Sequence, residues 1–248
     1  MPFGEQGKLS WELLVRQALP IRDRVQEVLG EELTPVNQSI DLVLGNLRIM
    51  GQTRDLLRRA SGDFVFCTPG FSRLGPGRLL GAWIRHLVVS RSLEGSLSTL
   101  VVGRDPDGKV PVKGVQFTPR DEGAAKSPDT KGLGPDALEA LVELYQRGSH
   151  SFLPFFPNSC FALAKVLAPK DWARDEENLK KAMAAATKVW ESSQYVLGEG
   201  EDRYLSLYLN TPQGPIRPFG DPKAFETLGI WDLTQTIYQP LFDNLEDL

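Results

Sequence analysis

The sequence predicts an α/β domain with a central mixed sheet, helices on both faces of the sheet and a mainly helical C-terminal half. Two observations predict this fold class. The first is a change of apolar spacing, which is helical over residues 9–30 and alternates as in a strand over residues 36–57. The second is the order that follows, in which a third strand, a strong helix and further strands succeed the hairpin.

Residues 9–30 are predicted to form the first helix, because apolar side chains recur there at roughly helical spacing. Ser10 is expected to cap this helix, and Pro20 is expected to kink it. The apolar stripe consists of Leu13, Val15, Leu19, Ile21, Val25 and Val28.

Three strands are expected next. "VNQSIDLVL" and "LRIMGQTRDLL" alternate as strands around a turn at Gly45-Asn46, which predicts a hairpin. "DFVFCT" is short and apolar, like a buried strand, and we expect it to pair next to the second strand. It should end at Pro69, because proline cannot donate to a ladder.

A helix over residues 78–94 and two more strands are predicted to complete the sheet. The helix should turn Leu79, Leu80, Trp83, Leu87 and Val88 inward. "STLVVGRDPDG" and "VPVKGVQFTP" are the predicted strands. Residues 119–134 are rich in Gly, Pro, Asp and Lys and are expected to form a mobile loop.

The second half of the chain is predicted to be mainly helical. We expect helices over 135–147, ended by Gly148, then within "LPFFPNSCFALAKVL", over 175–192 and over about 232–245. The whole of 1–248 is interpreted as a single domain. It would consist of a sheet core over 1–118, the loop 119–134 and the helical part 135–248.

Composition excludes several functions. The 248 residues include 41% hydrophobic and 24% charged ones, as in globular domains, and carry a net charge of −4. A protein that held nucleic acid by whole-surface attraction would be basic, so DNA contact would need a local basic patch. Cys67 and Cys160 form no CxxC pair, which argues against a disulfide framework or zinc site and suits a reducing compartment. No signal peptide or membrane span is apparent, and we expect a cytoplasmic protein.

The usual catalytic groups are missing from the sequence. Its two histidines, His86 in a helix and His150 after a predicted helix end, lie near no Ser or Cys in a nucleophile elbow. There is no GxxxxGK[ST] loop for phosphates. We therefore expect no cofactor, no metal and no catalytic residues.

One pattern resembles the metal site of DNA-cleaving enzymes. Many metal-dependent nucleases carry an acid on the second strand of a hairpin and an acid-x-Lys triplet on the next strand, which together hold Mg²⁺ and orient water. Here the first position falls on Arg54 or Asp55, and a one-residue register slip decides between them. Cys67 and Pro69 stand at the acid and lysine positions. Cysteine is a poor ligand for Mg²⁺ and proline carries no charge, so the site is predicted to be degenerate.

Two alternatives remain open. In the first, the chain is an active metal-dependent nuclease whose acids come from elsewhere, with Asp41, Asp55, Asp63 and Glu94 as candidates. In the second, it is an adaptor that binds proteins and makes no DNA contact.

Binding surfaces are predicted from local clusters. The candidate DNA-binding residues are Arg73, Arg78, Arg85 and Arg91, with a second arginine group around the second strand. The candidate partner-binding residues are Phe155, Phe156, Trp231 and Phe242. The alternative for the phenylalanine pair is a core plug that joins two helices.

The chain also resembles a known family, the C-terminal domain of RecC, the gamma chain of exodeoxyribonuclease V. The resemblance rests on the order of short segments along nearly the whole chain. These segments are "PFGEQGKL", "MGQTRDLL", "LLGAWIRHLVV", "LVELYQRGSHSFLPFFPNS", "ATKVWESS", "GEGEDRYLSLYL" and "YQPLF".

The resemblance implies a restriction-endonuclease-like fold, close to that of the RecB nuclease, which has lost its metal site. It also implies that the chain is a fragment of a longer subunit of the RecBCD helicase–nuclease. RecB-like and RecD-like subunits and DNA would then be its partners, and DNA-end binding, strand separation and subunit contacts in double-strand break repair its role.

Overall fold

The computed structural model describes residues 4–30, 32–118, 135–194, 196–212 and 214–248. The chain divides into two compact units, a sheet unit of residues 1–125 with 244–248 and a helical unit of residues 126–243. The predicted loop 119–134 lies outside the described residues.

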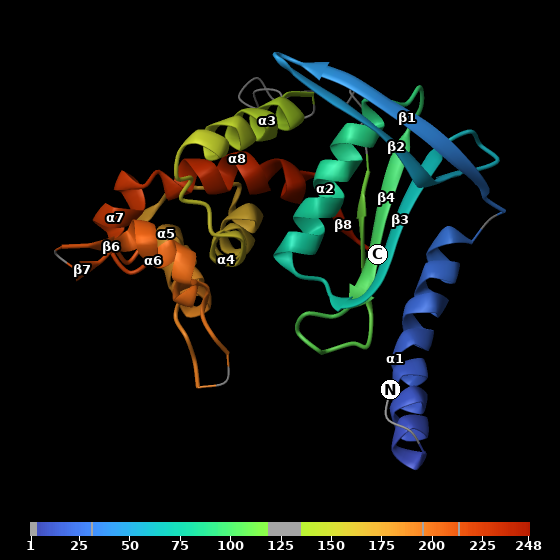
Figure 1. The fold of residues 1–248 in the computed structure, drawn as a ribbon, viewed down its shortest axis with the longest axis horizontal. Coiled ribbons are helices and arrows are strands. Elements are labelled where there is room, and N and C mark those ends of the chain that lie inside the picture. The colour runs from blue at the N-terminus through green and yellow to red at the C-terminus, as the bar shows by residue number, and fades with distance from the viewer. Residues whose placement is uncertain (1–3, 31, 119–134, 195, 213) are drawn as a thin grey trace. The chain divides into compact units, whose positions relative to one another are not determined.

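The sheet unit is built around a six-stranded mixed sheet, which has the predicted α/β character (Figure 1). The strands follow the order β1-β2-β3-β4-β5-β8; β3 and β4 are parallel, and the other neighbours are antiparallel. The elements are α1 (Glu5–Leu29), β1 (Thr34–Leu44), β2 (Leu47–Arg58), β3 (Phe64–Arg73), α2 (Pro76–Ser90), β4 (Leu97–Arg104), β5 (Lys113–Phe117) and β8 (Leu245–Asp247).

The helical unit is organised around contacts of α4 with α5 and with α8. Its larger helices are α3 (Pro135–His150), α4 (Pro157–Leu167), α5 (Glu176–Trp190) and α8 (Ile230–Asp243). Its smaller elements are η1 (Ala168–Lys170), η2 (Glu199–Glu201), α6 (Arg203–Leu209), β6 (Asn210–Thr211), β7 (Gly214–Pro215) and α7 (Pro222–Thr227). Sequence analysis missed the smaller elements, which are too short to show a period.

Helices α1 and α2 lie on opposite sides of β3 and β4 (Figure 1). On the α2 side, the Nδ1 atom of His86 lies 3.0 Å from the hydroxyl oxygen of Thr99, and the Arg85 guanidinium lies over the Phe66 ring. Because side chains alternate along a strand, Cys67 on β3 points to the opposite side, toward α1.

The predicted hairpin is confirmed, but the start of the first helix differs. Helix α1 begins at Glu5, after Gly4, so Ser10 is inside the helix; its hydroxyl donates to the Gln6 carbonyl and does not cap. Pro20 lies inside the helix, which ends at Leu29.

The predicted end of β3 at Pro69 is wrong, because the strand continues to Arg73. The carbonyls of Thr68 and Gly70 point toward β4, so the nitrogen of Pro69 between them points toward β2. Strand β2 pairs with β3 only as far as Phe66. The missing N–H of Pro69 therefore costs no ladder hydrogen bond.

Candidate functional site

A β-bulge on β2 explains why the sequence leaves Arg54 and Asp55 ambiguous. Val36 pairs with Leu56, whereas Gln38 pairs with Thr53, so both Arg54 and Asp55 lie opposite Asn37. Both side chains are exposed. The bulge interrupts the alternation of side chains between the two faces of β2 at the predicted first acid position.

Strands β2 and β3 form a fork immediately after this bulge. The last pair between β2 and β3 is Leu56 with Phe66, and Asp55 and Cys67 do not pair with each other. Cys67 and Pro69 lie on the same side of β3, paired with Leu100 and Val102 of β4. The structure thus brings the predicted degenerate positions to one place, the mouth of the fork.

A second irregularity separates β3 from β4 just beyond Pro69. Pro69 pairs with Val102 and Arg73 with Arg104, so residues 70–72 of β3 stand against the single residue Gly103 of β4. The extra residues leave carbonyls on both strands without ladder partners, and such groups need other donors when they are shielded from water.

The guanidinium of Arg78, from the first turn of α2, supplies those donors. Its Nη2 donates to the carbonyls of Thr68 (2.7 Å) and Val102 (2.9 Å), and its Nη1 donates to those of Gly70 (3.3 Å) and Ser72 (3.2 Å). A Cβ on Gly103 would lie 2.5 Å from Nη1, so the missing side chain leaves the space that the guanidinium fills.

The thiol of Cys67 is neutral at this site. Burial raises its pKa to about 11, and the positive charge of Arg78 only partly opposes that effect. A neutral thiol is neither a nucleophile nor a metal ligand, because both roles need the thiolate. A fixed cation and a neutral thiol therefore lie side by side at this end of β3.

The end of the β3–β4 pair is rich in arginine. Arg73 and Arg104 are partners across the parallel pair, about 5 Å apart at Cα. The guanidinium of Arg104 lies 4.8 Å from the centre of the Phe71 ring. Arg73 is one of the predicted DNA-binding residues, whereas Arg104 and Phe71 were not predicted, because only the register shift brings the three residues together.

The other predicted DNA-binding residues have different surroundings. The Arg78 guanidinium is committed to backbone carbonyls, so its donors are not free for a DNA phosphate. Arg85 is exposed in the middle of α2, and its guanidinium lies 5.2 Å from the centre of the Phe66 ring. Arg91 follows the end of α2 and is half-buried.

The predicted partner-binding aromatics are largely packed inside the helical unit. Phe156 is fully buried, with its ring against those of Trp190 and Phe219, and Trp231 is also buried. Phe155 and Phe242 are half-buried. A buried ring cannot contact another protein without local opening, so Phe156 and Trp231 are not part of the partner surface proposed below.

Exposed apolar side chains occur instead on α1, between Leu9 and Leu19. Trp11 is 58% exposed there and lines a shallow groove with Val15 and Leu19. The exposed apolar residues of this helix are Leu9, Trp11, Leu13, Leu14 and Leu19, which we call the α1 face. Leu13 and Leu19 belong to the apolar stripe that the sequence predicted for the first helix, but within α1 only Ile21 is buried.

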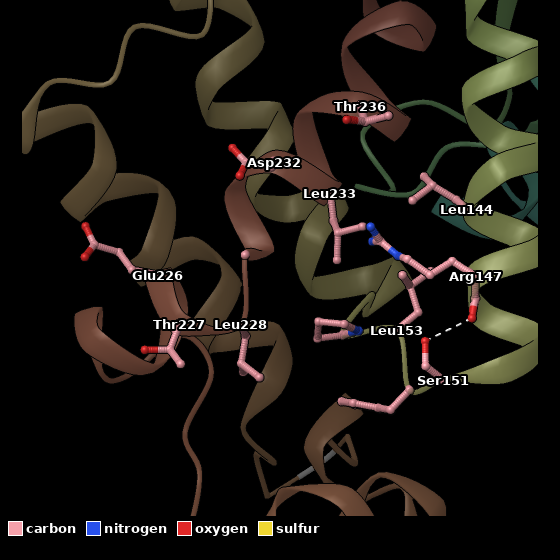
Figure 2. A pocket seen from close by; sticks show the side chains of 13 residues that line it. Leu144, Arg147, Ser151, Leu153, Glu226, Thr227, Leu228, Asp232, Leu233 and Thr236 are labelled. Atoms are coloured by element: carbon pink, nitrogen blue, oxygen red, sulfur yellow. Dashed lines mark hydrogen bonds between the residues drawn. The ribbon is translucent and has the colours of Figure 1, made fainter.

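The helical unit contains an open hollow of about 460 Å³, shown in Figure 2. It is lined by the end of α3, the segment after it, the end of α7 and the start of α8. Arg147 lies on one side, and Glu226 and Asp232 lie on the other. Its floor combines one cation, two carboxylates and leucine side chains, which defines no single ligand chemistry.

The acids of the alternative nuclease hypothesis have individual surroundings. Asp41 accepts two hydrogen bonds from Arg48, which hold its pKa below the usual value, and Asp63 accepts one from Ser61. Glu94 and Asp55 are exposed. In the described part of the chain, no three His, Cys, Asp or Glu residues gather closely enough to hold a metal ion.

The fold and the site define an α/β domain with a mixed six-stranded sheet, in which a strand fork is bordered by arginines. A comparison with protein families matches the RecC C-terminal domain over residues 1–168. The chain therefore belongs to the RecC C-terminal domain family, as the sequence resemblance implied. No curated protein matches the chain.

The matched residues include α1 to α4 and β1 to β5. Membership links the chain to the RecBCD complex, exodeoxyribonuclease V, and to DNA repair and recombination. No helix within the described ranges has the length and apolar character needed to span a membrane.

Proposed function

We propose that the chain is a catalytically inactive module with a restriction-endonuclease-like fold, which contacts DNA and neighbouring subunits in a RecBCD-type machine. The fold part of the proposal is supported by the element order α1, β1, β2, β3, α2, β4 and by the fork of β2 and β3. That order matches the hairpin and following strand on which many metal-dependent nucleases carry their acids.

The proposed inactivity rests on the side chains described at the fork, which include no pair of carboxylates. Cys67 has a neutral thiol, Pro69 has no ionisable group, and Arg78 places a positive charge beside them. A hard divalent cation needs several oxygen ligands and is repelled by a fixed guanidinium. Asp55 alone would supply one carboxylate.

A cleavage assay tests this proposal. The purified chain, incubated with linear duplex and single-stranded DNA and either Mg²⁺ or Mn²⁺, should leave the DNA intact. The matched control is Asp55→Ala, purified in the same way, because a contaminating nuclease would act equally in both preparations. Metal-dependent cleavage that disappears only in Asp55→Ala would contradict the proposal and favour the active-nuclease alternative.

DNA contact is proposed for the sheet unit, whose exposed arginines are local exceptions to the net charge of −4. In the parent complex this contact would contribute to binding DNA ends and separating their strands. Because only local clusters oppose the overall negative charge, binding by the chain alone should be weak and strongly salt-dependent. Tight, salt-insensitive binding would contradict it.

Subunit contact is proposed for the α1 face. An exposed tryptophan beside several exposed leucines is typical of the apolar centre of a protein interface. RecB-like and RecD-like subunits are the proposed partners. Trp11→Glu should reduce capture of the chain by these subunits, whereas Val43→Glu, at another exposed apolar site, should not. Equal capture of all three forms would exclude the α1 face.

A further inference from the structure

The end of the β3–β4 pair concentrates positive charge that nothing nearby neutralises. Arg73 and Arg104 are register partners there, and the Arg78 guanidinium bonds the carbonyl of Ser72, the residue before Arg73. Among the described residues, no carboxylate lies within ion-pair distance of any of the three guanidinium groups. Like charges this close repel one another, so the arrangement favours an anionic ligand.

The nearest acid along the chain is already occupied. Asp105 follows Arg104, but its carboxylate accepts hydrogen bonds from the backbone N–H groups of Lys109 (2.7 Å) and Val110 (3.3 Å). Its side chain is engaged in that turn and is 7% exposed. The Asp105 carboxylate therefore does not occupy the N–H donors of the Arg73 guanidinium.

The roles of the three arginines differ. Arg78 is fixed to backbone carbonyls and holds the widened strand end in shape. Arg73 is exposed and has no partner among the described residues. Arg104 is half-buried, its guanidinium is held against Phe71, and its Nε is buried without a hydrogen-bond acceptor. Among the described residues, neither Arg73 nor Arg104 is bonded to a carboxylate or a backbone carbonyl through its side chain, in contrast to Arg78.

Phe71 adds a second kind of contact. Its side chain is 39% exposed although Arg104 covers part of it. An exposed ring beside two guanidinium groups that have no carboxylate partner is the combination that binds single-stranded nucleic acid, because bases stack on the ring and phosphates pair with arginine. Base pairs in a duplex are stacked on one another and do not offer that face.

We propose that Arg73, Arg104 and Phe71 form a binding site for single-stranded DNA, with the arginines on backbone phosphates and the Phe71 ring under a base. This inference rests on the proposed DNA contact of the sheet unit and assigns it to one location and one form of DNA. The site begins one ladder step beyond Pro69, so it adjoins the fork without using it.

The test is a salt titration of oligonucleotide affinity with the full 248-residue chain. A labelled oligothymidylate of about 20 nucleotides serves as the single strand, and a duplex of equal length serves as the comparison. The double variant Arg73→Gln, Arg104→Gln should weaken oligothymidylate binding at least about fivefold at low salt. It should also flatten the logarithmic salt dependence by about 1.4, or 0.7 for each lost phosphate contact.

Two further variants separate the contributions. Phe71→Leu should weaken oligothymidylate binding severalfold, leave the salt dependence unchanged and affect the duplex less, because the ring carries no charge. Arg73→Gln alone removes an exposed side chain without an internal partner, so its folding should be unaffected and its affinity reduced.

The matched control is the double variant Arg174→Gln, Arg203→Gln. Both arginines are exposed and belong to the helical unit, to which no DNA contact is assigned, and the Arg174 guanidinium also lies over an aromatic ring, 5.3 Å from the centre of Trp231. The control removes the same charge, and it should bind oligothymidylate nearly as well as the unchanged chain.

Two outcomes would overturn the inference in different ways. If the unchanged chain binds neither oligonucleotide at low salt, the proposed DNA contact fails, and the inference fails with it. If the unchanged chain binds but the strand-end variants bind equally well, or no more weakly than the control, the DNA contact stands and only its assignment to Arg73, Arg104 and Phe71 is wrong.

Discussion

Arg78 and Gly103 depend on each other for space. The guanidinium bonds four backbone carbonyls, and it fits because Gly103 has no side chain. An arginine on the first turn of a helix beside a glycine-rich loop resembles a solvated or ligand-binding side chain in sequence. Arg78 instead bonds backbone carbonyls that the register shift between β3 and β4 leaves without ladder partners. No local sequence pattern predicts that shift.

Gly103→Ala should therefore destabilise the sheet unit by about 2–4 kcal/mol, because the new methyl group displaces the guanidinium and strains the chain. The control is Gly81→Ala on α2, where a Cβ would meet nothing within 4 Å. Alanine in a helix interior should stabilise by about 0.5–1 kcal/mol. Denaturant unfolding of both variants measures these changes, and equal midpoints would contradict the space argument.

His86 makes the stability of the sheet unit depend on pH. Burial lowers its pKa to about 4, and the ring stays neutral beside Thr99. In the unfolded chain its pKa is about 6.5, so below that pH the unfolded state takes up a proton that the folded state refuses. Stability is therefore retained above about pH 6.5 and lost between pH 6.5 and 4, by about 2–3 kcal/mol.

The measurement is the unfolding free energy of the unchanged chain and of His86→Gln across that pH range. The variant should lose less stability than the unchanged chain as the pH falls, because it lacks the titrating group. His150→Gln removes the other histidine, which is exposed, and should keep the pH dependence of the unchanged chain. If the unfolding free energies of the unchanged chain, His86→Gln and His150→Gln all change with pH in the same way, His86 is not the cause of the pH dependence.

At the level of the elements, helix α2 anchors the sheet through aromatic packing. Trp83 is 2% exposed, and its ring centre lies 5.4 Å from that of His86 and 5.3 Å from that of Phe117 on β5. The sequence predicted this burial from the apolar face of the helix, and the structure confirms it.

Trp83→Ala should destabilise by about 3–5 kcal/mol, since it leaves a large cavity between the helix and the sheet. Trp11→Ala, on the exposed α1 face, should change stability by less than about 1 kcal/mol. Both values come from denaturant melts. A loss below about 1 kcal/mol for Trp83→Ala would mean that the α2 packing is not as described.

The elements predicted well from the sequence are long segments in which apolar residues recur regularly. They are the β1–β2 hairpin, α2, α5 and α8. Strand β8 consists of Leu245, Glu246 and Asp247, which carry no pattern and form a strand only by pairing with β5. The assignment of Cys67 and Pro69 to a degenerate site stays a prediction, and Arg104 was missed because its place depends on the register of two strands.

At the level of the whole molecule, the helical unit is inserted into the sheet unit between β5 and β8. Deleting residues 245–248 should leave an edge of β5 unpaired and destabilise the sheet unit by about 1–2 kcal/mol. The deletion should leave the helical unit unchanged, so calorimetry should show a shift in one transition only. Lys113→Ala, which removes only the exposed ion pair to Asp247, should have little effect.

A single transition that shifts as a whole would instead show that the two units unfold together. That result would favour the single domain that the sequence suggested. Two transitions, of which only one shifts, would establish independent stability for each unit.

The pairing of β5 with β8 also has a consequence for synthesis. Val115 pairs with Asp247, and the whole helical unit lies between these two residues in the sequence. During synthesis the ribosome completes the helical unit before it adds β8. The helical unit can therefore fold first, while the edge of β5 is still unpaired. The sheet, although it occupies the start of the chain, would be the part that finishes last.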